Sequence, residues 1–577
     1  MTRNRYLRYL IAPAIGLGLC WPVWSAEISS EQAKTAVANW ARQVPHPLGA
    51  KLGQTVRSAR TFSDKEGNAL FHVVRFQEGG YAVAAADDGI LPIIAFSDDD
   101  DLVVDERNPL WVMLNRDLPQ RLAMAKKAAR HQLPAEASDD ADKHAARWQR
   151  LLSSSTGNDY TTLDASVSDT RVSPFLTTTW DQQTAYGSAC YNYYTPPGAE
   201  GTYGNYPCGC VATAGAQLMR FHQYPTASVT ATNYIIWIDG VSSNATMKGG
   251  TYSWSDMPAN PNTSSTTLTQ RQAIGKLTYD VGVACYMAYA AAGSGAYDFN
   301  LVSAFKNRFG YSDAVTMMNQ NTGVMSSIQN AALSNLDAKY PVIFGISGSG
   351  GGHEVVGDGY GYTSGNLYLH LNMGWSGSYN AWYNLPTFTA YFSFTVLDSI
   401  IYNVFPTSTV EVVSGRVLDN TGAAVSGASV VATNKSTGLS AVLTDANGVY
   451  AFLVPEPSFR GATYQITASL GARTVVASAT VRQSVSTTYS YTPSSGNATY
   501  TPGSGTVGNS WGNNLTLPDP APDAPTGVSA SDGTAAANVA ISWSAATYAM
   551  GYGIYRYTSD NSASASWVGS ASGTTYS

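Results

Sequence analysis

One segment of the sequence combines residue types that could attack an acyl bond. Residues Cys208–Ala214 read CGCVATA and continue with small and apolar residues at helical spacing until shortly before Pro225. This pattern predicts a buried helix with Cys210 at its N-terminus, where unpaired backbone N–H groups favour an anion. A thiolate there, paired with an imidazolium, can have its pKa lowered from about 8.5 to about 3–4. The same N–H groups can hold an oxyanion. On this segment alone, a structural cysteine is an equally good interpretation.

A thiolate nucleophile needs a base, and two of the nearby histidines are the first candidates. His222 is on the same predicted helix, about 18 Å from Cys210 at 1.5 Å per residue, and cannot reach it. His353 follows the glycine-rich run 348–352 and begins a predicted strand, which would hold its imidazole at a cleft. It comes about 140 residues after Cys210, the order and scale of papain-like enzymes. We therefore predict that His353 is the base.

A third histidine and an asparagine share one face of the predicted strand 367–372. For His370, a hydrogen-bonded core histidine is the better interpretation. An Asn372 amide that accepts from the far ring N–H of His353 would fix the imidazole tautomer, and Trp375 would shield that bond from water. Taken alone, the segment Asn372–Trp375 is better explained as an ordinary turn with a packed aromatic side chain. Combined with the preceding candidates, it favours function.

Taken together and in this order, these motifs resemble the streptopain family of secreted bacterial cysteine peptidases. That family has a papain-like fold and an inhibitory N-terminal propeptide. The resemblance rests on five segments: Gly209–Ala214 with Gln217 and Tyr224-Pro225, Gly352-His353 with Asp358-Gly359, Asn372–Trp375, Asp280–Val283 with Gly293–Ala296, and the prosegment pieces 80–83 and 86–88. It implies an α+β fold, in which a papain-like peptidase of two subdomains follows an α+β propeptide and precedes all-β sandwich modules. It implies no cofactor and no metal.

The resemblance also implies further site residues. Gln182 would complete the oxyanion hole beside the Cys210 N–H, although the adjacent Gln183 leaves the register open by one residue. The segment from Tyr286 to Ala296 would line the pocket for the substrate residue two before the scissile bond. The substrate-binding candidates are Met287, Ser294, Gly295, Ala296 and Gly352. The sequence departs from the family pattern in three places. Met373 stands where a second aromatic residue is common, residues 288–290 loosely replace a more polar stretch, and Cys208 lies two residues before the nucleophile candidate.

Composition changes along the chain predict its domain organisation. The 577 residues suggest three to five domains. Within the first, a capping box at Ser29–Gln32 predicts a helix, three short strands follow between residues 70 and 96, and the polar segment 134–142 is expected to be exposed and cleavable. The predicted parts are a signal peptide (1–26), a propeptide (27–165), a peptidase (166–406), a β-sandwich resembling carboxypeptidase-regulatory modules (409–492), a linker (493–523) and an incomplete fibronectin type III-like domain (524–577). Because the final strands of that last domain are absent, we expect the chain to be a fragment or to end early.

The N-terminus indicates export. A basic start, an apolar run from Leu10 to Leu19 and small residues at Ser25 and Ala26 fit a signal peptide. Cys20 raises a lipoprotein alternative, but the bulky Leu19 precedes it. No later segment is long and apolar enough to predict a membrane-spanning helix. The formal charge of −7 argues against a nucleic-acid binder.

Four cysteines remain after export. In an oxidising compartment Cys190 and Cys208 could close a short loop, which would leave Cys210 free. The sequence thus predicts a secreted cysteine endopeptidase made as a zymogen, which acts on proteins or peptides and is inhibited by its own propeptide. Cleavage is expected within 153–171. Two alternatives stay open: a cell-wall peptide amidase or transpeptidase with the same chemistry, and a non-catalytic surface adhesin.

Overall fold

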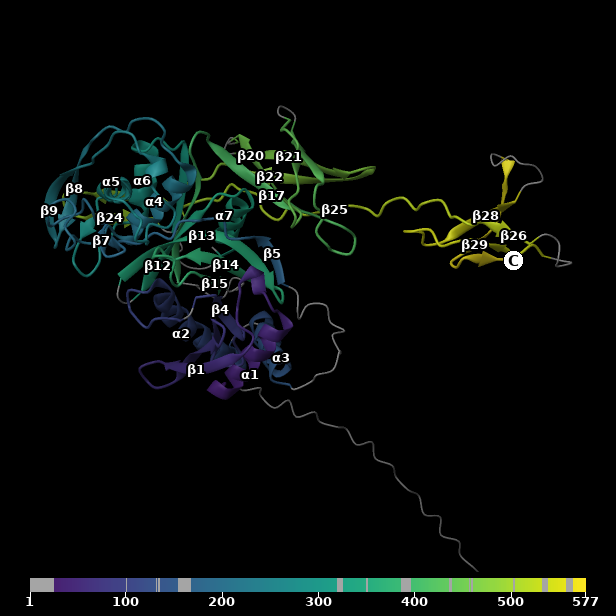
Figure 1. The fold of residues 1–577 in the computed structure, drawn as a ribbon. Helices are drawn as coiled ribbons and strands as arrows, with labels where there is room; N and C mark the ends of the chain where they lie inside the picture. The colour runs from purple at the N-terminus through teal and green to yellow at the C-terminus, as the bar shows by residue number, and fades with distance from the viewer. Residues whose placement is uncertain are drawn as a thin grey trace, which may run out of the picture. The chain divides into compact units, whose positions relative to one another are not determined.

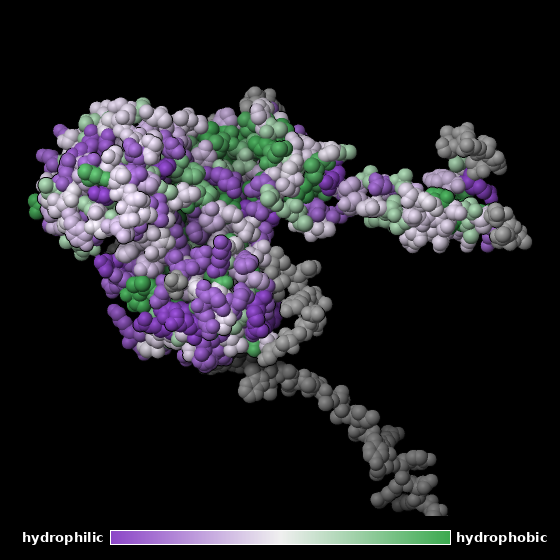
Figure 2. All heavy atoms as spheres, in the orientation of Figure 1, coloured by the Kyte–Doolittle hydropathy of each residue, from purple (hydrophilic) through white to green (hydrophobic). Residues whose placement is uncertain are grey.

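The computed structural model of the chain describes residues 25–99, 101–130, 132, 135–153, 168–318, 325–348, 351–385, 396–434, 438–455, 457, 460–501, 504–531, 538–556 and 564–577. The chain divides into two compact units, Met1–Ser166 and Val167–Ser577 (Figure 1). Except for its last two residues, the predicted signal peptide lies outside the described residues, as does most of the predicted cleavage segment. The surface of the first unit is mostly hydrophilic and that of the second is paler, in line with the fall in charge along the sequence (Figure 2).

The first unit contains an antiparallel sheet of order β1-β2-β3-β4 and three helices. Their bounds are α1 Ser30–Gln43, β1 Val56–Ser63, β2 Ala69–Phe76, β3 Tyr81–Ala85, β4 Ile93–Ser97, α2 Pro109–Ala129 and α3 Ala135–Leu152. The predicted capping box is confirmed: Ser29 Oγ accepts from Gln32 N, and Gln32 Oε1 accepts from Ser29 N. Three of the four strands were predicted. The sequence analysis missed β1, whose polar residues are largely half-buried or exposed.

Of the polar segment 134–142, predicted to be exposed and cleavable, the residues from 135 onward are helical, and Asp139 and Asp142 are exposed as expected. Helix α3 begins at Ala135 and runs to Leu152. Trp148 on this helix is buried and donates from Nε1 to the carbonyl oxygen of Ile90 at 2.9 Å. A single buried aromatic at helical spacing therefore holds a stretch whose composition alone is typical of a loop.

In the second unit, the peptidase sheet has the order β15-β14-β13-β12-β16-β11, and β5 pairs with β13. The bounds are β5 Ser168–Val172, β11 Asp313–Met318, β12 Val342–Gly348, β13 Gly351–Thr363, β14 Asn366–Asn372, β15 Ala381–Asn384 and β16 Leu397–Phe405. The beginning of β13 pairs with β12, and its end pairs with both β5 and β14. Strand β13 therefore links the predicted base to the start of the peptidase.

A helical part of the peptidase packs against this sheet. It contains α4 Cys210–His222, β8 Asn233–Ile238, β9 Val241–Thr246, α5 Leu268–Ala284, β10 Ala288–Tyr289 and α6 Asp298–Asn307. Helix α4 is buried from Cys210 to Met219 and contacts both α5 and β13. The close approach depends on Gly215, where a side-chain carbon would lie 2.8 Å from Leu301 Cδ1. The predicted buried helix and the α+β peptidase of two parts are confirmed.

An all-β sandwich follows the peptidase, as predicted. One sheet has the order β20-β17-β25 and the other β19-β18-β21-β22. The bounds are β17 Val410–Leu418, β18 Ser429–Thr433, β19 Val442–Leu443, β20 Val449–Pro455, β21 Ala462–Leu470, β22 Arg473–Val481 and β25 Leu515–Thr516. Alternating residues of the two sheets, including Val413, Val430, Phe452 and Ile466, form its core.

Residues 493–523, for which composition predicts a linker, instead contain ordered structure. Strand β24 (Asn497–Tyr500) pairs with β23 (Tyr489–Thr492) as a hairpin, and β25 completes a sandwich sheet by pairing with β17. The Gly, Ser and Asn residues of this stretch serve turns and close backbone approaches. Gly508, for example, lies against the Arg482 backbone, which a side-chain carbon would meet at 2.0 Å.

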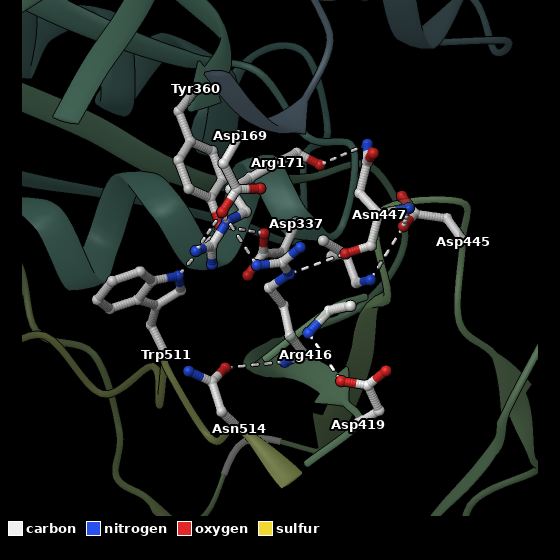
Figure 3. Close-up of polar contacts among 12 residues, drawn as sticks. Asp169, Arg171, Asp337, Tyr360, Arg416, Asp419, Asp445, Asn447, Trp511 and Asn514 are labelled. Carbon is white, nitrogen blue, oxygen red and sulfur yellow. Dashed lines mark hydrogen bonds and ion pairs between the residues drawn. The ribbon is translucent and has the colours of Figure 1, made fainter. Parts of the chain in front are cut away.

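The sandwich is joined to the peptidase by a buried polar network (Figure 3). Arg416 of β17 pairs with Asp169 of β5 at 3.2 Å, and Arg171 pairs with the same carboxylate at 2.8 Å. Asn447 donates to the Arg171 carbonyl oxygen. Arg416 is only 7% exposed, so its charge depends on this partner. The sandwich is therefore packed on the peptidase rather than tethered to it.

The end of the chain forms two small sheets. Strands β26 Ser529–Ala530, β27 Ile541–Ser542 and β30 Thr575–Tyr576 make one, and β28 Tyr552–Arg556 and β29 Ser566–Ala571 make the other. Strands β27 and β28 lie within residues 537–543 and 551–557, whose sequence predicts two strands. Within the ranges given above, the structure contains no helix with the length and hydrophobicity needed to cross a bilayer.

Candidate active site

Cys210 is the first residue of α4 and is 9% exposed. The preceding Gly209 has a φ of +92°, a conformation that favours glycine. Its surroundings also exclude a side chain, because a carbon added there would lie 2.8 Å from Ser294 O and 2.9 Å from Met287 Cε. Gly209 thus lets the segment containing Ser294 pack directly beside the nucleophile candidate.

His353 is near the start of β13, opposite Ile346 of β12. The Cys210 Sγ lies 4.0 Å from the carbonyl oxygen of Gly352, and the Glu354 N–H is a hydrogen-bond donor to the same sulfur. The thiol therefore lies against the main chain on both sides of His353. Tertiary structure brings together two residues that are far apart in the sequence.

The other two histidines of the peptidase have structural surroundings, as predicted. His222 ends α4 and packs edge-on against Tyr311, and burial lowers its pKa to about 4. His370 Nδ1 lies 2.6 Å from Asp358 Oδ1, and its ring contacts Trp382. His370 is the hydrogen-bonded, partly buried histidine that the sequence analysis expected.

The thiol of Cys210 has a different protonation state from the one its helix position suggests. Burial raises its pKa to about 11, and the nearby carboxylate of Glu354 adds to the rise. The backbone N–H groups of Glu354, Val211 and Cys210 lower the pKa, but they do not offset desolvation. The expected lowered pKa is thus absent from this conformation, in which the thiol is neutral. A thiolate would require an imidazolium partner.

Asn372 is buried at the end of β14, and its side-chain amide makes hydrogen bonds to three residues. Its Nδ2 donates to Thr178 O at 2.8 Å, and its Oδ1 accepts from Gly374 N at 3.0 Å and from Gln217 Nε2 at 3.4 Å. Strand pairing places Asn372 opposite Val356, three residues after His353. The amide is therefore fixed close to the strand that carries the base candidate.

The loop after Asn372 is held against the segment that precedes the nucleophile. Ser376 Oγ donates to Asp181 Oδ2 at 2.6 Å. Trp375 is half-buried and faces Tyr379, with ring centroids 6.2 Å apart. Met373, where the family often has an aromatic, is buried and fills the space with its flexible side chain.

The register question between the two adjacent glutamines has a geometric answer. Gln182 O accepts from Cys208 N at 2.8 Å, so the Gln182 backbone lies two residues from the nucleophile candidate. Gln183 is exposed, and its carbonyl oxygen accepts from Cys190 N and Asn192 N. This arrangement favours Gln182 over Gln183 as the oxyanion-hole candidate.

The predicted substrate-binding residues gather beside Gly209. Met287 and Ser294 contact it, as described above. Gly295 exchanges backbone hydrogen bonds with Ala288 at 2.9 and 3.0 Å, and Ala296 lines a cavity next to this pair. Gly352 is exposed and its carbonyl oxygen faces the thiol. The candidates thus lie near Cys210, but Met287 is fully buried in the core and Ser294 is also buried, so they do not form one exposed surface.

Two segments of the chain match models of known protein families. Residues 180–383 match the family model described as the Peptidase C10 family. The match covers this segment and not the whole chain. In the first unit, residues 25–121 match the model described as a Spi protease inhibitor.

Proteins similar to this chain include named proteases. The chain is 29% identical to streptopain of Streptococcus pyogenes over 209 residues, 34% of this chain and 51% of the relative. It is 27% identical to the thiol protease/hemagglutinin PrtT of Porphyromonas gingivalis over 173 residues, 30% of this chain and 20% of the relative. The chain spans about half the length of the streptopains it matches. Among solved structures, a prointerpain A fragment of Prevotella intermedia is 23% identical with a TM-score of 0.44, covering 61% of this chain and 99% of that one.

The four cysteines at positions 190, 208, 210 and 285 are all free thiols. The possible disulfide between Cys190 and Cys208 is not formed. Cys208 Sγ instead lies 3.3 Å from Thr213 Oγ1, one turn along α4, and burial raises its pKa to about 12. Burial also raises the pKa of Cys190. Cys208 is thus a buried neutral thiol and no competitor of Cys210 for a proton acceptor.

No role was predicted for Gln217, whose side-chain amide contacts that of Asn372 within the segment that matches the Peptidase C10 model. Its side chain is fully buried, accepts from Thr178 Oγ1 at 2.8 Å and donates to Asn372. A signal was present, because Gln217 is seven residues after Cys210 and so lies on the same face of the helix. The partner Thr178 had no recognisable signal, since its contact depends on the packing of a loop.

Proposed function

We propose that this protein is a secreted cysteine endopeptidase synthesised as a zymogen. The observation that carries the proposal is the position of the Cys210 thiol at a helix N-terminus, against the main chain on both sides of His353. The match to the Peptidase C10 family and the likeness to streptopain support it. The C-terminal sandwich and the final segment, which resemble carboxypeptidase-regulatory and fibronectin type III modules, are proposed to be accessory modules.

In the proposed mechanism, Cys210 loses its proton to His353 and attacks the peptide carbonyl carbon. The oxyanion accepts from the Cys210 N–H and the Gln182 side-chain amide. His353 then donates the proton to the leaving amine, which departs and leaves a thioester on Cys210. Water, deprotonated by His353, hydrolyses the thioester and restores the thiol. Asn372 is proposed to orient the imidazole, with Trp375 as a shield from water.

The first unit is proposed to be the intramolecular inhibitor. Its match to a Spi protease inhibitor supports this role, and it favours an endopeptidase over a cell-wall amidase or an adhesin, because an endopeptidase must be silenced before export. The signal-peptide pattern supports export. Maturation would cut after α3 ends at Leu152 and before β5 begins at Ser168, since β5 is hydrogen-bonded into the peptidase sheet.

A labelling experiment tests the proposed function directly. The purified mature protein is treated with an epoxide-type thiol inhibitor and assayed on casein and on purified peptidoglycan. We expect casein cleavage, stoichiometric labelling of Cys210 and loss of both in Cys210→Ala. Cys285→Ala is the matched control, because Cys285 is also a buried free thiol but ends α5, and it should keep both. Cleavage of peptidoglycan but not casein would support the amidase, and the absence of both labelling and cleavage the adhesin.

A further inference from the structure

The hairpin β23–β24 contacts the peptidase through aromatic rings. Tyr489 stacks on Phe299 with centroids 4.5 Å apart. Tyr491 lies 5.1 Å from Tyr286 and 5.9 Å from Tyr297, both in tilted or edge-on geometry. Such pairs are favourable beyond the area they bury. The hairpin, which follows the sandwich in sequence, is therefore anchored on the peptidase beside the segment 286–297.

A cavity of about 540 Å³ lies between the hairpin and the peptidase. Its lining residues are Trp237, Gly240, Tyr286, Ala288, Gly295, Ala296, Tyr297, Asn300, Tyr491, Ser495 and Gly496. The last three belong to the hairpin and form one wall. Gly496 brings the hairpin turn against the indole of Trp237, with a side-chain carbon position 3.4 Å from Cζ2 (Figure 1 shows β24 beside β8).

This cavity is adjacent to the nucleophile candidate. The backbone pair Ala288–Gly295 forms part of its floor. The residues next to this pair in sequence, Met287 and Ser294, contact Gly209, which directly precedes Cys210. The residues of the cavity floor are therefore one position along the chain, about 3.8 Å between Cα atoms, from the residues that contact Gly209.

The chemistry of the walls defines the ligand. Four aromatic residues, Trp237, Tyr286, Tyr297 and Tyr491, line the cavity together with glycine, alanine and the polar Asn300 and Ser495, and none of its lining residues carries a charge. A volume of this size is within the range of pockets that enclose small ligands. Such a cavity suits an aromatic or large aliphatic side chain and excludes a charged one.

We infer that the hairpin β23–β24 supplies one wall of a subsite that selects an aromatic or large aliphatic residue of the polypeptide substrate. This inference rests on the proposed endopeptidase function. The bound residue lies on the side of the scissile bond served by the segment Met287–Ala296. The hairpin is thus a specificity-determining part of the enzyme, and Tyr491 is its principal contact.

Kinetics on a positional peptide library test this role. In Tyr491→Ala, the preference in kcat/KM for Phe or Leu over Gly at the selected position should fall about 5- to 10-fold, the value of one aromatic contact. Ser490→Ala is the matched control, because alternation along β23 places Ser490 on the other face of the hairpin, and it should keep the wild-type preference.

A second variant keeps the test independent of folding. Ser495→Trp adds a ring to the cavity wall at an exposed position and should reduce cleavage of the Phe peptide while sparing the Gly peptide. The inference is overturned if both variants keep the wild-type preference. Epoxide labelling separates this outcome from failure of the proposed function: a wild type that neither labels nor cleaves any peptide refutes the endopeptidase itself.

Discussion

Arg416 of the sandwich and Asp169 of the first peptidase strand form an ion pair of 3.2 Å in which the arginine is nearly fully buried (Figure 3). Asp169 also pairs with Arg171, so two guanidinium groups share one carboxylate. Strand β5 is thereby fastened on two sides, by backbone hydrogen bonds to β13 and by this pair. The start of the mature peptidase and the sandwich therefore depend on each other for stability.

Removal of this carboxylate should destabilise the second unit. Asp169→Asn leaves two cationic side chains close together, one of them buried without a counter-charge, and we expect a loss of about 3 kcal/mol in the free energy of unfolding. Urea unfolding monitored by fluorescence measures it. The control is Lys339→Met, which breaks the exposed 3.9 Å pair with Asp445 and should cost at most about 1 kcal/mol. Equal losses in the two variants would contradict the assigned importance of the buried pair.

Self-processing should remove the first unit in the wild type only. The wild-type precursor is expected to shorten by about 15 kDa at the mean residue mass of this chain, whereas Cys210→Ala stays intact. N-terminal sequencing of the product should place the new terminus between Leu152 and Ser168, because cleavage within β5 would break its pairing with β13. Equal processing of both proteins in a protease-free preparation, or a terminus beyond Ser168, would defeat this prediction.

The neutral thiol of Cys210 predicts a pH dependence of its alkylation in the precursor. Because burial raises its pKa to about 11, the thiolate fraction should grow about tenfold per pH unit from pH 7 to 10. The rate of iodoacetamide modification of Cys210, measured by peptide mass spectrometry, should rise in proportion. A mature enzyme with a thiolate–imidazolium pair should instead react at a rate that is nearly constant above pH 5. A flat profile in the precursor would show that the ion pair exists before maturation.

The two adjacent glutamines offer a matched test of the oxyanion hole. Gln182→Ala should lower kcat about 100-fold or more on a small peptide substrate, since one donor to the oxyanion is lost. Gln183→Ala should leave kcat unchanged, because the Gln183 side chain is exposed and its carbonyl oxygen bonds away from the nucleophile. If Gln183→Ala lowered kcat and Gln182→Ala did not, Gln183 would be the oxyanion-hole residue.

Local sequence patterns were sufficient for the elements that carry the chemistry. The apolar spacing after Cys210 predicted α4, and the alternation in 367–372 predicted β14, because both patterns depend on neighbours along the chain. Composition was misleading for residues 493–523, which contain β24 and β25, and it did not reveal helix α3, which begins at Ala135 and includes the buried Trp148.

Taken by itself, the sequence determined which cysteine begins a buried helix and which histidine begins a strand, since periodicity is a short-range property. Only the tertiary structure decided that the Cys210 sulfur lies beside the Gly352 carbonyl, that burial raises the pKa of its thiol, and that Tyr491 lines a cavity near it. These facts depend on contacts between residues more than a hundred positions apart and on the water that those contacts exclude. No local pattern encodes either.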